Sequence, residues 1–261
     1  MRSHIASLFT LFLLPASIVF NSSASHAQIT NSGKGYLVRI AGHPGEKISY
    51  AFTTSFKMPA TMSKSFPDSA VTMSVTEKIL KVHGDVYTIQ MTMRNMKTSG
   101  KNMPSSQIYA NKPIITKMKS DGQVVGGTMP MMENMSFGSL YLKPLQIGHT
   151  YSVPVSSPNP LMSMFGMKML DKITFVGFKM FHGIKTAEMR ISLTGTSSGG
   201  AQTSHMPKAY VTSTGTELLS VSDGWPEYMS MKSSTQMPGM GTGKMRSTPI
   251  HMTMNMTMIR K

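Results

Sequence analysis

Cysteine is absent from all 261 residues, and charged residues of either sign make up only 14% of the chain. Without cysteine there is no disulfide framework, no thiolate metal site and no lipid-accepting cysteine behind an export signal. The low charge, together with 40% hydrophobic residues, excludes a disordered tail, a coiled coil and an acidic linker. The composition therefore predicts a packed globular protein of one or two domains.

The chain also lacks three common catalytic and nucleotide-binding motifs. It contains no H-E-x-x-H, no G-x-x-x-x-G-K-[ST] and no G-x-G-x-x-G stretch. Its 11 acidic residues are dispersed, and Asp223 and Glu227 are the one pair within four positions of each other. A catalytic pair of carboxyls is thus not indicated by spacing. We expect a protein that is not an enzyme.

The first 27 residues have the parts of a secretory signal peptide. Arg2 precedes an apolar stretch from Ile5 to Phe20, which Pro15 interrupts, and the small residues of Ala24–Ala27 follow. We expect cleavage after Ala27 and a mature protein in the periplasm or secreted from the cell. No later stretch is apolar over the length that a membrane-spanning helix requires.

Basic residues outnumber acidic ones, and the formal net charge is +15. Of the 26 basic residues 20 are lysine, and they are scattered rather than gathered in a run. An exported chain rarely meets nucleic acid, so we expect no nucleic-acid partner. The charge favours peripheral contact with an anionic membrane surface or solubility in acid.

Alternation of apolar and polar residues dominates the chain and predicts half-buried β-strands. The segments are Ile48–Phe52, Val71–Val75, Ile89–Met93, Met189–Leu193 and, most clearly, Met252–Met258. Leu161–Leu170 is the one segment whose composition also allows a short helix. The fold class expected is all-β, an antiparallel curved sheet or half-barrel.

Glycine turn signals separate these strands, at His83-Gly84-Asp85, Asp121-Gly122, His182-Gly183 and Thr214-Gly215. Three markers recur in the same order at a nearly constant offset, which suggests two related β-units of about 100 residues each. Their bounds would be 28–142 and 143–261, either as two units or as one continuous domain. Chance recurrence of glycine turns is the alternative.

The segment Lys143–Tyr151, with the sequence KPLQIGHTY, follows the Asp121-Gly122 hairpin signal. This order resembles that of uncharacterised secreted β proteins in which such an entry strand starts the second half. Those proteins are similar to the half-barrels of the lipoprotein-carrier type. The resemblance implies a binding or carrier role around a concave apolar face and transfers no catalytic residue. His149 stands where that pattern commonly has an acidic residue.

Methionine is the unusual residue, with 28 of the 29 lying after residue 27. Thioether sulfur is soft and does not titrate, so it selects Cu(I), also in acid. We interpret the alternating methionines of the strands, including Met252–Met258, chiefly as core. Those in proline- or glycine-rich loops, and one mixed His-Met pair, are the candidate metal ligands: Met129, Met131, Met132, Met135, Met237, Met240, Met245, His205 and Met206.

The leading hypothesis is therefore an exported, non-enzymatic protein that buffers or carries Cu(I) weakly at several thioether sites. A second hypothesis is a periplasmic carrier of a lipid or other apolar ligand, in which methionine supplies an adaptable lining. A third is an oxidant sink, in which surface thioethers are oxidised and then reduced again. Compositional excess of methionine, without any function, is the fourth reading.

Overall fold

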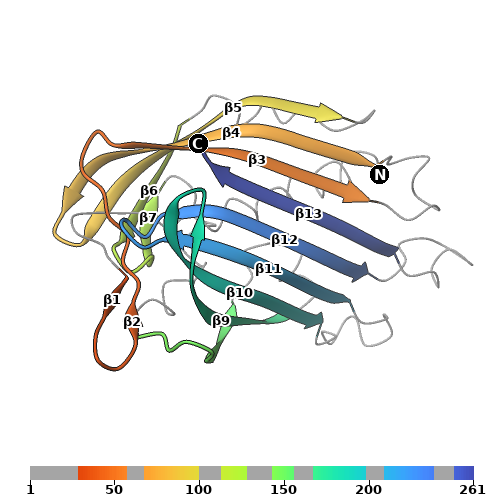
Figure 1. Cartoon of the computed structure of the whole chain (residues 1–261). Coiled ribbons are helices and arrows are strands. Elements are labelled where there is room, and N and C mark those ends of the chain that lie inside the picture. The colour runs from red at the N-terminus through yellow and green to blue at the C-terminus, as the bar shows by residue number, and fades with distance from the viewer. Residues whose placement is uncertain are drawn as a thin grey trace, which may run out of the picture.

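The computed structural model describes residues 29–57, 68–99, 113–127, 143–155, 167–197, 209–237 and 250–261. These residues form one sheet of 11 antiparallel strands and a separate hairpin of two short strands. The part of the chain so described contains no apolar helix of membrane-spanning length. The expected all-β class with an antiparallel curved sheet is confirmed (Figure 1).

The large sheet has the order β7-β6-β5-β4-β3-β13-β12-β11-β10-β9-β8 and is not closed, because β7 and β8 are its two edges. The hairpin pairs β1 (Thr30–Asn31) with β2 (Tyr36–Leu37). The strands of the large sheet are β3 (Lys47–Lys57), β4 (Ser69–His83), β5 (Val86–Ser99), β6 (Ile114–Lys119), β7 (Val124–Gly127), β8 (Thr150–Val155), β9 (Met167–Phe181), β10 (Ile184–Ser197), β11 (Tyr210–Ser220), β12 (Pro226–Met237) and β13 (Ile250–Arg260).

The first and last long strands of the chain meet in the middle of the sheet. β13 pairs antiparallel with β3, from Thr253 opposite Lys57 to Arg260 opposite Tyr50. From this seam each half of the chain continues outward, by β4 to β7 on one side and by β12 to β8 on the other. The two halves are thus continuous in one sheet, and their origin as two related units, 28–142 and 143–261, stays a prediction.

The alternation read from the sequence places the strands correctly. All five alternating segments lie inside strands, namely β3, β4, β5, β10 and β13. The glycine signals at Gly84, Gly122 and Gly183 are turns in which φ is positive, as tight hairpins require. Alternation therefore predicted the strands correctly, and three of the four glycine signals correctly predicted the turns between strands.

Two local predictions were wrong. Thr214-Gly215 is not a turn but lies inside β11, where Gly215 lets the backbone of Ser230 on β12 approach too closely for any side chain. The candidate helix Leu161–Leu170 fails in its described part, because Met167–Leu170 belongs to β9 and pairs with β10. Cross-strand pairing there overrides the helical tendency of Met and Leu.

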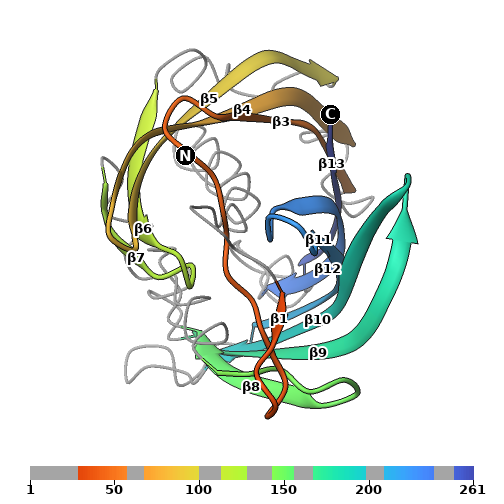
Figure 2. The same ribbon diagram turned by 60° about the vertical axis from the view of Figure 1, so that its left-hand side comes forward.

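A segment that we call the strap, residues 38–46, crosses the concave side of the sheet near one end of the strands (Figure 2). The amide of Ile40 donates to the carbonyl of Ser120 at 3.1 Å, that of Ala41 to Asp223 at 2.8 Å and that of Gly45 to Ile79 at 2.8 Å. Since these acceptors lie on elements of both halves, the strap joins the two sides of the open sheet.

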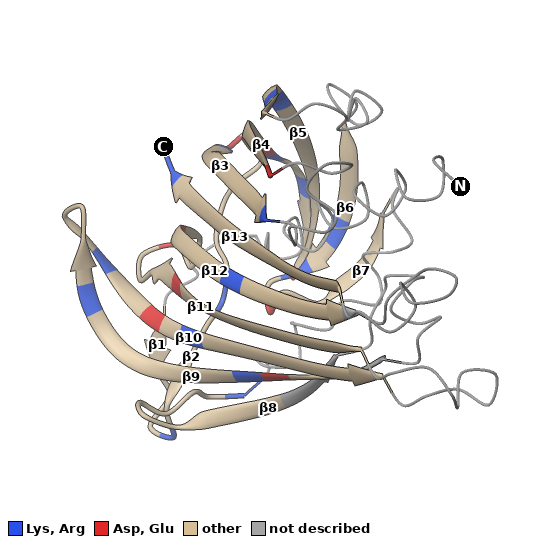
Figure 3. Cartoon of the chain, turned by 90° about the vertical axis from the view of Figure 1, so that its right-hand side faces the viewer, with Lys and Arg blue, Asp and Glu red and all other residues tan. Residues whose placement is uncertain are grey.

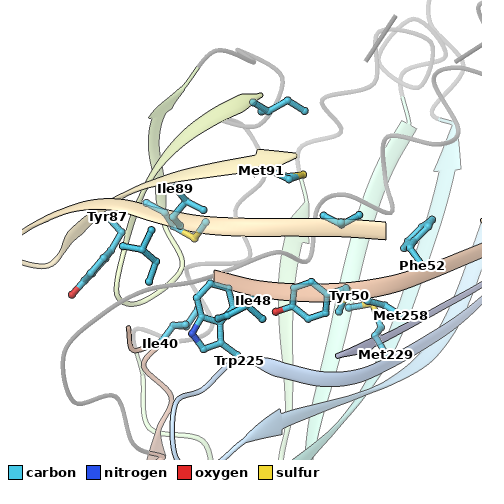
Figure 4. Close-up of a cluster of buried hydrophobic side chains, with 14 of the residues drawn as sticks. Ile40, Ile48, Tyr50, Phe52, Tyr87, Ile89, Met91, Trp225, Met229 and Met258 are labelled. Carbon is cyan, nitrogen blue, oxygen red and sulfur yellow. The ribbon is translucent and has the colours of Figure 1, made fainter. Parts of the chain in front are cut away.

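The buried indole of Trp225 fixes the middle of the strap. Its Nε1 donates to the carbonyl of Ala41, and its ring lies beside Ile40 and Ile48 in the larger apolar cluster (Figure 4). The preceding Gly224 has φ +71 and lies so close to the carbonyl of Arg39 that a Cβ would overlap it. The turn between β11 and β12 therefore requires glycine for backbone conformation and for space.

Five connections outside the described residues join strands at the end opposite the strap. They follow Lys57, Ser99, Val155, Ser197 and Met237, and each is preceded by a strand that runs away from the strap. The turns at the strap end are short by comparison, with His182 and Gly183 alone between β9 and β10. The two ends of the sheet thus differ: one is closed by the strap, and the other receives the long connections.

Replacing Gly224 by alanine is expected to loosen the strap. The Gly224→Ala side chain would combine a positive φ with overlap on Arg39, whereas Gly84→Ala meets a positive φ of +61 in open space. We expect Gly84→Ala to lower the free energy of unfolding by about 1 kcal/mol and Gly224→Ala by roughly 1–3 kcal/mol more. Urea denaturation of both variants measures the difference, and equal losses would show that the close approach to Arg39 is unimportant.

Candidate functional site

The concave face of the sheet is defined by side chains that lie opposite one another across successive strands. Its middle row crosses seven strands, from β9 to β4, in the order Phe175, Met189, Glu217, Met229, Met258, Phe52 and Met73. The next row contains Ile173, Ile191, Gly215, Met231, Met256, Thr54 and Val71. Apart from Glu217, Thr54 and the glycine, these rows are apolar.

Thioethers recur on this face in both halves of the sheet. We call them the thioether wall: Met73, Met91, Met93, Met118, Met169, Met189, Met229, Met231, Met252, Met254, Met256 and Met258. Met229, Met256 and Met258 are buried, while Met231, Met252 and Met254 are half-buried. Exposure of the β13 thioethers therefore increases away from the strap, toward the end with the long connections.

The opposite face of the same strands is polar. Along β13 the alternate positions are His251, Thr253, Asn255 and Thr257, and the other strands carry serine, threonine and lysine in the same phase. In Figure 3 the basic residues are spread over many strands, and the acidic residues are few. The sheet is thus amphipathic, and its apolar side is the concave one, which the strap crosses.

Buried acids interrupt the apolar concave face, among them Glu77 on β4 and Glu227 on β12, and two others lie in its apolar rows. Glu217 on β11 stands in the middle row between Met189 and Met229, and Asp171 on β9 follows the phase of Ile173 and Phe175. Asp171 is 1% exposed and Glu217 is 3% exposed. Both oxygens of Asp171 are buried without a hydrogen-bond partner, a costly arrangement for a group that is charged in water.

The surroundings shift the protonation of both acids. Burial raises the pKa of Glu217 from 4.5 to about 8, and the negative charge of Asp171 adds to this rise. Burial also raises the pKa of Asp171, from 3.8 to about 6. Near neutral pH the pair therefore carries about one negative charge rather than two.

Two further acids on the concave side are paired with an arginine. The guanidinium of Arg260 donates to Asp223 at 2.9 Å and to Glu227 at 2.7 Å, next to the buried ring of Tyr50. Burial raises the pKa of Glu227, which Arg260 opposes, while burial and the charge of Glu77 hold the pKa of Tyr50 well above its usual value. This network ties the end of β13 to the β11–β12 turn.

Eight of the nine residues that the sequence proposed as metal ligands lie outside the described residues. They are Met129, Met131, Met132, Met135, His205, Met206, Met240 and Met245. The ninth, Met237, is the last residue of β12, and its backbone pairs with Ile250. Loop methionines as Cu(I) ligands thus stay a prediction, while the described part of the chain contains no cluster of three His, Asp or Glu suited to a metal.

Sequence reasoning missed Asp171 and Glu217. A signal for Asp171 was present, because it falls in phase with the apolar residues Ile173 and Phe175 of an alternating stretch. An acidic residue on the apolar side of a strand is unusual and marks a position to examine. Spacing along the chain could not bring the two together, since the sheet alone joins β9 to β11 through β10.

The stretch Gly195–Gly199 matches the G-x-S-x-G pattern of hydrolase nucleophile elbows. That pattern requires a sharp turn from a strand into a helix, whereas Gly195–Ser197 continue β10 and pair with β9. The hydroxyl of Ser197 accepts a hydrogen bond from the amide of Ala209 at 2.8 Å. Ser197 therefore has a structural partner, and no residue described here acts as its base.

The tip of the β9–β10 hairpin exposes apolar side chains beside lysines. Met180 is 64% exposed and Ile184 is 38% exposed, and Lys179 and Lys185 flank them. Lys179 pairs with Glu188 at 3.0 Å, and the ammonium of Lys185 lies over the ring of Phe178. Contact with an anionic membrane surface stays a prediction, and this tip is where we expect it.

Comparison with known proteins assigns the chain to no family. No protein-family model and no curated protein matches the chain. Among solved structures, it is similar to a DUF1329 family protein from Desulfovibrio piger, with 8% sequence identity and a TM-score of 0.19. The match covers 82% of this chain and 85% of that one. A TM-score this low does not establish a shared fold. The carrier-type architecture suggested by the sequence therefore stays a prediction.

The buried acids predict a stability that falls as pH rises. In the unfolded chain a glutamate loses its proton near pH 4, whereas Glu217 in the fold keeps its proton to about pH 8. Between these values the native state binds more protons, so the free energy of unfolding falls with pH, by at most about 1.4 kcal/mol per pH unit for one group. Removing the titrating group should flatten this dependence.

Glu217→Gln tests this directly by urea denaturation at several pH values. We expect a shallower decline than in the wild type and a more stable protein at pH 8, while Asp85→Asn on the exposed β4–β5 turn leaves the profile unchanged. A profile for Glu217→Gln that matches the wild type would show that Glu217 ionises normally.

Proposed function

We propose that this protein is a non-enzymatic carrier that holds an apolar ligand against its concave face. One observation carries the proposal: a continuous apolar surface of thioethers and aromatic rings extends across both halves of a sheet that remains open. Ligand sites in proteins are concave, mostly apolar and provided with a few polar groups. The concave face has this composition, with Glu217 and Asp171 as its polar groups.

Methionine suits such a lining better than a β-branched residue does. Its unbranched side chain has three rotatable bonds and a polarisable sulfur, so it adapts to irregular or varied ligands. β-branched residues would fill β13 equally well as strand formers, yet four successive inward positions of that strand are methionine. The half-buried Met252 and Met254 mark the end of the wall where we expect a ligand to enter.

A charge placed on the wall should prevent binding. Met254→Glu puts a carboxylate between Ser233 and Phe56, on the concave face, while Asn255→Glu puts the same group on the exposed face one residue away. We expect Met254→Glu to weaken binding of the neutral probe N-phenyl-1-naphthylamine about tenfold or more, because burying an unpaired charge is costly. Asn255→Glu should bind like the wild type.

Fluorescence titration measures these affinities, and native mass spectrometry of the protein as purified shows any lipid that it retains. Circular dichroism and urea midpoints verify that both variants fold. If the wild type neither retains an apolar molecule nor binds the probe, or if the two variants weaken binding equally, the carrier proposal fails.

Carriage of Cu(I) is the second candidate, favoured by one feature of the wall. Met229 lies directly opposite Met258, and Met231 directly opposite Met256, on adjacent strands and the same face. Side chains of such opposed pairs start about 5 Å apart, within reach of one another. Thioethers select Cu(I) over harder ions, so this methionine quartet is a site that the described residues offer.

Anaerobic titration of Cu(I) against a chromophoric chelator distinguishes the quartet from the loops. Met→Leu changes nearly conserve volume, so the fold should tolerate them. If the quartet binds, the double variant Met231→Leu with Met256→Leu weakens Cu(I) binding. If the loops bind, replacing Met129, Met131, Met132 and Met135 does so instead. Unchanged binding in both would exclude both sites.

A further inference from the structure

Glu217 and Asp171 lie on the concave face, where a purely apolar ligand would offer their carboxyl groups neither a hydrogen bond nor an ion pair. Glu217 lies between the two apolar clusters of the sheet. Its neighbour on β10 is Met189 of one cluster, and its neighbour on β12 is Met229 of the other. Asp171 lies on the same face two strands away and four residues along the strands, in the row of Leu193 and Ser213, and its charge acts on Glu217. Packing alone would favour apolar residues at both positions.

Nothing in the described ranges neutralises these acids. The ion pairs there join Arg260 to Asp223 and Glu227, Lys179 and Arg190 to Glu188, and His43 to Glu46, and none includes Asp171 or Glu217. Both oxygens of Asp171 are buried without a hydrogen bond of good geometry, and the nearby backbone amide of Lys172 only partly offsets the burial that raises its pKa. A buried acceptor of this kind is stable when a bound molecule supplies the donor.

Further polar atoms lie on the same face. The hydroxyls of Ser213 and Ser233 are hydrogen-bonded to each other at 2.8 Å, in the row that begins with Asp171 and continues through Leu193. On β3, the hydroxyl of Thr54 is buried without a partner. On this face the hydroxyl of Thr54 and the carboxyl of Asp171 are thus buried polar groups without a hydrogen-bond partner of good geometry in the described protein.

We propose that the ligand is a cationic amphiphile, an apolar body that carries one protonated amine, and that Asp171 receives the amine, with Glu217 on the same face. This inference rests on the carrier function proposed above and names its ligand class. The carboxylate of Asp171 accepts the N–H donors of the ammonium group, Glu217 adds a polar group in another row of the same face, and the thioether wall covers the apolar body.

The charge balance of the site suits a single positive charge. Near neutral pH, burial leaves Glu217 mostly protonated and Asp171 mostly ionised, so the pair carries about one negative charge. One ammonium group neutralises it, and the protonated carboxyl of Glu217 remains neutral in its apolar surroundings. A ligand with a carboxylate or phosphate head would instead bring a second negative charge close to Asp171, which is unfavourable.

Three ligands of equal chain length test this proposal: decylamine, 1-decanol and decanoate, each displacing N-phenyl-1-naphthylamine from the full protein at pH 7. Primary amines are protonated at this pH. We expect decylamine to bind about 10- to 100-fold tighter than 1-decanol, as a hydrogen bond to a charged group would provide. Decanoate should bind most weakly.

The variant Asp171→Asn should remove the preference for the amine and leave the affinity for 1-decanol unchanged, while Asp85→Asn, which removes the same charge from an exposed turn, keeps the preference. If the wild type binds amine and alcohol equally, the amine proposal is overturned and the carrier proposal stands. If the probe and all three ligands fail to bind, both fall. The wild-type comparison decides the matter even where Asp171→Asn does not fold.

Discussion

The structure depends on one constraint: every strand of an open sheet directs its apolar side chains to the same face, and that face must be covered. A closed barrel would cover it by curling the sheet on itself. Here β7 and β8 remain apart. The cover is supplied in part by the strap, whose backbone bonds to both halves of the sheet. Trp225, Gly224 and the Arg260 network are the means by which the strap end is held.

The two ends of the concave face consequently differ in character. Near the strap it is a core of large side chains, with Trp225, Tyr50 and Met258 fully buried together with the acids Glu77 and Glu227. Away from the strap the thioethers of β13 become partly exposed, and the buried polar atoms of Asp171, Ser213 and Thr54 appear. The proposed carrier function needs both: one part that keeps the fold, and another whose side chains adapt to a guest.

Much of this fold was predictable because the sheet is amphipathic. Alternation in Ile48–Phe52 or Met252–Met258 identifies strands and their inward face without knowledge of the partners. The order of the strands was not predictable, since nothing local indicates that β13 pairs with β3 rather than with β8. Gly215 shows the same limit: a glycine beside threonine reads as a turn, and only the neighbouring strand reveals that it serves close packing.

For the site, sequence reasoning singled out methionine, and its assignment of ligands to the loop methionines stays a prediction. The methionines of the strands were interpreted chiefly as core and those of the loops as functional, but the described thioethers form the concave wall that now carries the proposal. The acids Asp171 and Glu217 escaped attention because they are distant in sequence and belong to no motif. Their burial and their positions in the strand register identify them as candidate site residues, and both are properties of the assembled sheet.

The seam between β3 and β13 also bears on how the molecule assembles. Thr253 lies opposite Lys57, so the centre of the sheet joins the beginning of the described chain to its very end. Loop closure over such a separation is slow, and strands that pair locally form first. Each half would therefore exist for a time as a separate meander with its thioethers bare to water. Removal of β13 would leave two half-sheets with no seam between them.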